Sequence, residues 1–160
     1  MSIDAHWPAD WNDRVAGIGC VMCGSPRADS DRYGVRIRST PDIDAVLQRV
    51  DLQRGYTLVI WRGRHVAEPY ELTGDEAAGY WGVVLRVAWA LATHYRPLKM
   101  NYETLGNSVP HLHTHLIPRY REDPAPGRPF PLAPATEREP LSDAALGPDV
   151  EALRGLLRHE

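Results

Sequence analysis

The sequence predicts an α+β fold with a mostly antiparallel sheet. Short segments in which apolar residues alternate lie on both sides of one long segment whose apolar residues recur every three or four positions. A second, shorter helical segment follows near the end of the chain. Strands on both sides of a single long helix are typical of an α+β domain rather than of a repeating βαβ protein.

Alternating apolar residues predict five strands. The segments "YGVRIR" (33–38) and "DAVLQRV" (44–50) alternate and are separated by a turn signal, Pro41-Asp42. The nearly continuous apolar run "GYTLVIW" (55–61) predicts a central strand buried on both faces. After Pro97, "LKMNYETL" (98–105) and "HLHTHLIPRY" (111–120) predict an antiparallel pair joined by "GNSVP".

Two segments have helical patterns. Thr73 followed by Glu76 is a capping-box pair, and the apolar spacing after it predicts a helix over 74–95. A shorter helix is expected from about Pro148, with the proline in its first turn. Between them, the proline-rich run at 122–140 predicts an extended tail or linker outside the core.

The length of 160 residues predicts one domain over 1–160. We divide it into an N-terminal arm (1–30), a core (31–120), and a proline-rich tail with the terminal helix (121–160). A formal net charge of −3 argues against a nucleic acid polymer as partner. Without an apolar run of membrane length or a secretory start, we expect no membrane partner and a cytoplasmic location.

Three of the seven histidines, His111, His113 and His115, occupy every second position of a predicted strand. Side chains two apart share one face of a strand, while Leu112, Thr114 and Leu116 would line the other face. A solvated or structural role is the ordinary interpretation for a single histidine, but three in register favour chemistry. At roughly 3.3 Å per residue, the Cα atoms of His111 and His115 are about 13 Å apart, so one ion is not expected to bind all three rings.

Cys20 and Cys23 in "GCVMCG" are the only cysteines. Their spacing fits a zinc site, a pair of bystander thiols, or a redox motif, although the strand-then-helix context of a redox motif is absent from the sequence pattern. A closed zinc site needs four ligands, so two histidines must be added. His65, just after the central strand, and His111, at the start of the histidine row, are the hypothesised partners.

The segment "HLHTHLI" resembles the histidine triad (HIT) motif, except for the polar Thr114. "YTLVIWRGRHVAEPYELTGDE" and "GNSVPHLHTHLIPR" resemble the family's strand, histidine-containing turn, capped helix, phosphate loop and active strand, so the resemblance covers about 44–120. It implies a five-stranded HIT-like sheet with one long helix, a homodimer, and a hydrolase or transferase acting on small nucleotides. Candidate substrates are dinucleoside polyphosphates and nucleoside phosphoramidates.

The resemblance also assigns roles to residues. His113 would attack the α-phosphorus and form a covalent nucleotidyl-histidine. His115 and Ser108 would donate to the phosphate or the leaving group, and Asn101, Gly106 and Asn107 would bind the phosphate. Zinc-containing relatives use a Cys-x-x-Cys pair with two histidines as a structural site, which agrees with Cys20, Cys23, His65 and His111.

One position departs from the family pattern. Where several relatives have an acidic residue that binds ribose, this chain has Arg49, for which we considered either an exposed structural arginine or a phosphate contact. Two other functions remain open at this stage. One is a nucleotide-binding regulatory protein with little turnover, and the other is a metal-dependent enzyme with a catalytic ion on His111 and His113.

Overall fold

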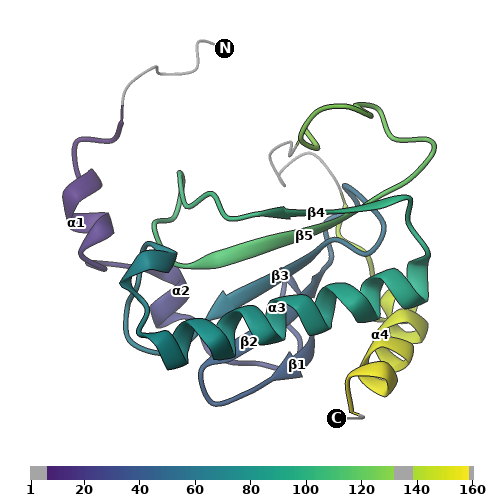
Figure 1. Cartoon of the computed structure of the whole chain (residues 1–160), viewed down its shortest axis with the longest axis horizontal. Helices are drawn as coiled ribbons and strands as arrows, with labels where there is room; N and C mark the ends of the chain where they lie inside the picture. The colour runs from purple at the N-terminus through teal and green to yellow at the C-terminus, as the bar shows by residue number, and fades with distance from the viewer. Residues whose placement is uncertain (1–6, 132–138, 159–160) are drawn as a thin grey trace.

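The computed structural model describes residues 7–131 and 139–158. A five-stranded antiparallel sheet forms its centre, with the strands in the order β1-β2-β3-β5-β4. The long α3 crosses one face of the sheet, α4 packs beside it, and α1 and α2 lie at one end (Figure 1). The elements are α1 (Trp11–Val15), α2 (Val21–Gly24), β1 (Gly34–Ser39), β2 (Ile43–Gln48), β3 (Thr57–Trp61), η1 (Pro69–Glu71), α3 (Gly74–Tyr95), β4 (Lys99–Glu103), β5 (His113–Arg119) and α4 (Asp143–Arg158).

This architecture confirms the predicted α+β class, the five strands, the long helix and the C-terminal helix. The prediction of one domain over 1–160 includes residues outside the described ranges and stays a prediction. No helix in the described part of the chain has both the length and the apolar character needed to cross a bilayer.

The hydrophobic core lies between one face of the sheet and the two long helices. Strand residues that point to this face include Val59, Leu112 and Leu116, each at most 1% exposed. From the helices, Tyr80, Leu91 and other residues pack against them. No helix of the described residues covers the opposite face (Figure 1), and the histidines of β5 lie on it.

The capping box predicted for α3 is present. Thr73 Oγ1 accepts a hydrogen bond from the Glu76 N–H at 3.3 Å, and the Glu76 carboxylate accepts one from the Thr73 N–H at 2.8 Å. The helix ends at Arg96, whose φ of +52° is left-handed, directly before Pro97. The capping box satisfies free backbone N–H groups at the start of the helix, and the left-handed residue before proline ends it. The predicted bounds of 74–95 are therefore confirmed.

Two helix and strand predictions were wrong in detail. Helix α4 begins at Asp143 and not at Pro148, because Ser142 caps it by accepting from the Ala145 N–H at 3.2 Å. Pro148 lies inside the helix, where it removes one backbone donor. Strand β3 is buried on one face only, since Leu58 and Ile60 are half-buried on the face without helices.

The proline-rich segment is also more than a tail. Phe130 is 7% exposed and packs with Tyr56 and Ile117 in a second small cluster on the histidine face. Arg119 holds the loop between β5 and Phe130, because it donates to the backbone oxygens of Arg128 at 2.9 Å and Ala125 at 2.7 Å. Residues 132–138 of the segment lie outside the described ranges.

Thr114, the polar departure from the triad pattern, is fully buried under α3. Its hydroxyl lies 2.8 Å from the Tyr80 hydroxyl and 2.8 Å from Thr104 Oγ1. The tyrosine also donates to the Val59 carbonyl at 3.1 Å. A buried hydroxyl with two partners avoids the cost of an unsatisfied polar group, which explains why threonine is tolerated here.

Arg49 occupies neither of the two environments considered for it. It is 8% exposed, and its guanidinium donates to the backbone oxygens of Asp31 at 2.7 Å and Leu141 at 2.9 Å. It also bonds Ser30 Oγ at 2.6 Å and pairs with Asp143. Arg49 therefore ties the start of α4 to β2. The prediction of an exposed arginine was wrong, and the protein partners of the guanidinium give no support to a phosphate contact.

Asp44, on the histidine face of β2, is the most buried carboxylate among the described residues, at 1% exposed. Arg27 Nη2 bonds it at 2.8 Å, Arg62 Nε at 2.9 Å, and Arg36 Nη1 lies 3.6 Å away. Burial by itself would raise the pKa of Asp44, but hydrogen bonds from Arg27 and Arg62 outweigh it and hold the pKa below its ordinary value. This network fixes the N-terminal arm to the sheet.

We expect Asp44→Asn to lower the free energy of unfolding by about 3 kcal/mol, because it leaves partly buried guanidinium groups without their counter-charge. Denaturant unfolding followed by tryptophan fluorescence measures the change. Asp29→Asn is the matched control: it removes a mostly exposed carboxylate that pairs with Arg36, and should cost at most about 1 kcal/mol. Equal costs for the two variants would contradict the central role of Asp44.

Candidate active site and metal centre

His113 occupies the first position of β5, opposite Ile60 of β3, on the sheet face without helices. It is 6% exposed, and its Nδ1 lies 2.6 Å from the backbone oxygen of His111. Because a carbonyl only accepts, Nδ1 must bear the proton, and the lone pair is on Nε2. Burial lowers the pKa of His113, so the ring is neutral near pH 7 and Nε2 is a nucleophile.

His111 lies just before β5, so the prediction that all three histidines share one strand was wrong for this residue. Its N–H donates to the Val109 oxygen at 2.8 Å, which closes a three-residue turn and ends the strand pairing. Its ring turns away so that Nε2 lies 2.6 Å from the Trp61 oxygen. The turn separates His111 from His113 and His115 and directs it to the N-terminal arm.

Four predicted metal ligands, Cys20, Cys23, His65 and His111, come together. Their donor atoms all lie within 4.8 Å of one another. His111 Nδ1 is 3.4 Å from each cysteine Sγ, and His65 Nδ1 is 3.3 Å from Cys23 Sγ. Separations of about 3.5 Å between nitrogen and sulfur are what a tetrahedral zinc with bonds of 2.0 to 2.3 Å requires.

Both imidazoles also have the tautomer that a metal needs. His111 Nε2 lies 2.6 Å from the Trp61 oxygen, and His65 Nε2 lies 3.1 Å from the Val15 oxygen. Because carbonyl oxygens only accept, both Nε2 atoms are protonated and both Nδ1 lone pairs face the thiols. Two thiols and two correctly oriented imidazoles form a donor set that fits Zn²⁺.

The backbone of the N-terminal arm is shaped to bring the cysteines to this place. Gly17 has φ +82°, and a Cβ there would lie 2.7 Å from Cγ of His65. Glycine therefore lets the arm turn directly over the imidazole. Arg62, already bonded to Asp44, donates to the Met22 oxygen between the cysteines at 2.6 Å.

The redox alternative for the cysteine pair finds no support in its surroundings. Burial, followed by the neighbouring Cys20 thiol, raises the pKa of Cys23 to about 11. A redox-active cysteine needs a lowered pKa to supply thiolate at neutral pH. The two thiols are not joined in a disulfide.

His115 lies beside His113 on the same face, with ring centroids 4.9 Å apart. Burial, and secondarily the charge of His113, lowers the pKa of His115 to about 4. Its Nδ1 is 2.7 Å from the Tyr56 hydroxyl. Near pH 7 the two rings are therefore neutral neighbours, each with one nitrogen held by a protein group.

The predicted phosphate loop connects β4 to β5. Gly106 has φ +71°, a conformation that favours glycine, and Asn107 and Ser108 are exposed. Ser108 lines a cavity of about 320 Å³ together with Asp10 and Cys20 of the N-terminal arm. The loop thus lies beside the N-terminal arm, and its contact with a phosphate stays a prediction.

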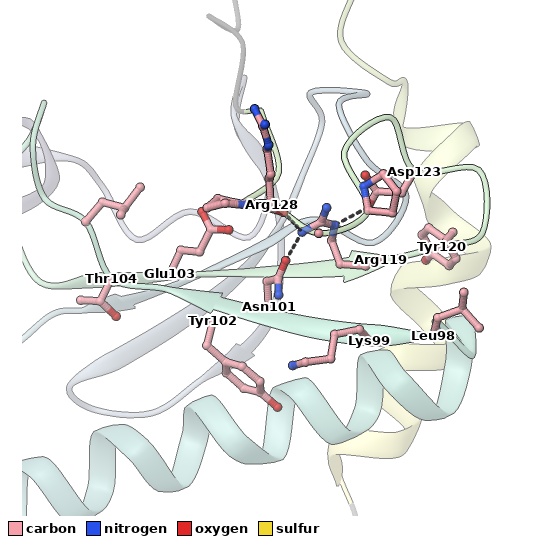
Figure 2. A pocket seen from close by; sticks show the side chains of 14 residues that line it. Leu98, Lys99, Asn101, Tyr102, Glu103, Thr104, Arg119, Tyr120, Asp123 and Arg128 are labelled. Atoms are coloured by element: carbon pink, nitrogen blue, oxygen red, sulfur yellow. Dashed lines mark hydrogen bonds and ion pairs between the residues drawn. The ribbon is translucent and has the colours of Figure 1, made fainter.

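Asn101 of β4 is opposite Ile117 of β5, on the histidine face. Figure 2 shows it beside Arg119, which donates to Asn101 Oδ1, and close to Glu103. With the amide oxygen engaged, the Nδ2H₂ group is the part that can donate to a phosphate. These residues line a cavity of about 770 Å³, whose wall includes Asp123 and other residues of the proline-rich loop.

Sequence reasoning missed Tyr56 as a partner of His115. The period of two could have found it, because Tyr56 and Leu58 point to the same side and Leu58 is opposite His115. Asp44 was also missed. Its only signal is a carboxylate at a position where neighbouring residues of the strand are apolar.

The pattern of the HIT domain matches residues 32–122, which is more than half of the chain. The chain belongs to the HIT family. The Protein hit of Bacillus subtilis is 30% identical over 106 residues, covering 63% of this chain and 71% of the relative. The adenosine 5′-monophosphoramidase hnt1 of Schizosaccharomyces pombe is 27% identical over 123 residues, covering 76% of this chain and 90% of the relative.

Solved HIT structures share the fold. A histidine triad protein of Bradyrhizobium japonicum superposes with a TM-score of 0.70 at 23% identity, covering 83% of this chain and 97% of that one. A zinc-bound histidine triad family protein of Mycobacterium smegmatis superposes with a TM-score of 0.56 at 21% identity, covering 92% and 91%. At these identities the likeness establishes the fold alone, and it confirms the HIT-like class.

Proposed function

We propose that this HIT protein is a nucleotide hydrolase or nucleotidyl transferase that acts at an α-phosphate through His113. Membership of the HIT family and a relative named as an adenosine 5′-monophosphoramidase support the reaction class. The observation that carries the proposal is the 2.6 Å contact between His113 Nδ1 and the His111 oxygen. That contact leaves a buried, neutral imidazole with its lone pair on Nε2, as nucleophilic catalysis requires.

The reaction has two steps. Nε2 of His113 forms a bond to phosphorus while the bond to the leaving atom breaks, and that atom takes the electron pair and a proton from His115 or Ser108. Water or another acceptor then attacks the same phosphorus, and the bond to Nε2 breaks. For a phosphoramidate the products are the nucleoside monophosphate and an amine, so the atoms balance with one water.

The remaining predicted residues would bind the phosphate. We propose that Asn101 donates to the phosphate through Nδ2H₂. The Gly106–Ser108 backbone and the Asn107 side chain approach the phosphate oxygens in this proposal. His115 donates from the same face as His113. Nucleoside phosphoramidates and dinucleoside polyphosphates are the candidate substrates. The cytoplasmic location stays a prediction.

Of the two alternative functions, the metal-dependent enzyme is disfavoured by the geometry. The ligand group among the described residues joins His111 to Cys20, Cys23 and His65, and His113 is not a member. His113 Nδ1 is instead engaged by a backbone oxygen. The second alternative, nucleotide binding with little turnover, is decided by the next experiment.

We expect His113→Ala to lower kcat for adenosine 5′-monophosphoramidate by more than about 10³-fold, since no other group supplies the nucleophile. Steady-state assays of ammonia release measure it, and mass spectrometry after rapid quenching should find the nucleotidyl adduct in the wild type. His94→Gln, on α3 and paired with Asp149, is the histidine control and should retain activity. Unchanged turnover in His113→Ala would refute the enzyme proposal, and binding without turnover in the wild type would favour the regulatory alternative.

We further propose that Cys20, Cys23, His65 and His111 hold a structural Zn²⁺. The donor separations, the two tautomers and the zinc-bound relative support this assignment. A bound zinc would fix the N-terminal arm against the loop that precedes β5. Through the backbone oxygen of His111 it would also steady the ring of His113.

We expect purified protein to contain about one zinc per chain by elemental analysis. Cys20→Ser combined with Cys23→Ser should remove the metal and lower the melting temperature by about 5–10 °C, because the arm loses its attachment. Val21→Ala is the matched control, since it changes an exposed residue between the cysteines and keeps all four ligands. Metal-free wild-type protein with an unchanged melting temperature after chelation would contradict the assignment.

We also propose a homodimer formed through the flank of α3 and the edge strand β4. Trp81, Leu85 and Trp89 lie four apart on one side of α3 and are 37%, 61% and 47% exposed. Arg86 and His94 turn toward α4 on the other side, and Trp89 stacks with Arg86, so Trp81 and Leu85 are the two that face the β4 side. An unpaired strand edge beside exposed aromatic residues fits a second copy of this chain.

Light scattering should give twice the chain mass of 17.9 kDa. Trp81→Glu combined with Leu85→Glu should halve that mass by placing charges in the apolar interface. Tyr70→Glu alters a tyrosine that is 84% exposed on η1 and should leave the dimer intact. A monomeric wild type at all protein concentrations would disprove the dimer.

A further inference from the structure

The Tyr56 hydroxyl is the protein group that contacts His115 Nδ1, at 2.7 Å. Tyr56 directly precedes β3. Its backbone still pairs with β2, because the Gln48 N–H donates to the Tyr56 backbone oxygen at 2.9 Å. The phenol and imidazole rings are nearly parallel, 7° apart, with centroids separated by 5.9 Å. The distance between the phenol oxygen and Nδ1 is that of a hydrogen bond.

The surroundings of Tyr56 decide which atom donates. The apolar residues packed around its ring are Ile117, Phe130, Leu52 and Leu58. Among the described residues, the hydroxyl has one hydrogen-bond partner, His115 Nδ1; Glu103 acts on it by charge and is not bonded to it. If Nδ1 donated to the phenol oxygen, the phenol hydrogen would have no acceptor among the described residues, at the cost of a buried unsatisfied donor. Donation from the phenol to Nδ1 satisfies both atoms.

The ionisation state agrees with this direction. Burial, and after it the charge of Glu103, raises the pKa of Tyr56 well above its ordinary value, so the phenol retains its hydrogen. Burial lowers the pKa of His115 to about 4, so its ring is neutral near pH 7 and one ring nitrogen accepts. A protonated phenol beside a neutral imidazole leaves Nε2 of His115 as the protonated nitrogen.

From this geometry we infer that Tyr56 is a positioning residue that holds His115 as the Nε2–H tautomer, ready to donate toward the reacting phosphate. The role rests on the proposed function, in which His113 is the nucleophile. His111 and Tyr56 thereby set opposite tautomers in two adjacent rings: His113 offers a lone pair at Nε2, and His115 offers a proton at Nε2. One step of phosphoryl transfer needs both.

Phe130 of the proline-rich segment contributes to this role by its position. With Ile117 of β5, it packs against the Tyr56 ring, which restricts the ring to the orientation that reaches Nδ1. Both residues are well buried, at 7% and 0% exposed. The proline-rich segment, which the sequence predicted as a tail, thus packs against Tyr56, the residue that contacts His115.

The decisive experiment is ¹⁵N NMR of histidine-labelled protein at pH 7, because it detects the tautomer without turnover. In the wild type, His115 Nδ1 should resonate as an unprotonated, hydrogen-bonded nitrogen and Nε2 as a protonated one. Tyr56→Phe removes only the hydroxyl and keeps the packing with Phe130. The variant should shift the Nδ1 resonance of His115 and leave His113 unchanged.

Tyr80→Phe is the matched control. It removes a buried hydroxyl of α3, bonded to Thr114 and Val59, which lies against the other face of the sheet. It should cost similar stability and leave the His115 resonances in place. With the phosphoramidate substrate, Tyr56→Phe should lower kcat about tenfold at a KM within about twofold, while Tyr80→Phe keeps both.

Two spectroscopic results would overturn the inference. One is a protonated Nδ1 on His115 in the wild type, and the other is an identical His115 spectrum in wild type and Tyr56→Phe. Because these are measured without substrate, they are separate from a failure of the proposed function, which would appear as full activity in His113→Ala. Loss of activity in Tyr80→Phe equal to that in Tyr56→Phe would also refute a specific positioning role.

Discussion

The hydrogen bond from His113 Nδ1 to the His111 oxygen depends on the position of His111, a residue that contacts three parts of the molecule. Its ring is held by the Trp61 oxygen at the end of β3, its Nδ1 faces the cysteines of the N-terminal arm, and its own carbonyl orients the ring of His113. The three-residue turn at His111 is what allows this, because a continuous strand would point its ring to the same side as His113. Displacement of His111 would therefore disturb the cysteine-histidine cluster and the ring of His113 together.

The division of the sheet into two faces provides the second constraint. Helices α3 and α4 cover one face and supply the hydrophobic core, so stability is concentrated there. The other face carries His113, His115, Tyr56 and Asn101, which can be polar because no helix must pack on them. The cost of placing polar groups there is limited by specific partners: the backbone oxygen for His113, the phenol for His115 and three arginines for Asp44.

Short sequence patterns predicted the features that depend on residues close together in the chain. Thr73 and Glu76 identified the start of α3 because a capping box is formed within four residues, and the period of two placed His113 and His115 together. The four candidate metal ligands, which the structure brings together, could be proposed from the sequence because donor type and spacing are restrictive. What could not be predicted depends on distant partners. Arg49 bonds residues up to 94 positions away, and Phe130 meets Tyr56 only after the chain has folded back. The start of α4 was missed because a serine cap outweighs an internal proline.

The separation of the cysteines from His111 along the chain has a consequence for folding. Cys20 and His111 are 91 positions apart, and between them lie the first four strands and the long helix. Pairing of β3 with β5 brings His111 to the end of β3, near His65, so the four donor atoms come together as the sheet forms. An ion held by these four residues would therefore stabilise the paired sheet, and the paired sheet would raise the affinity for the ion.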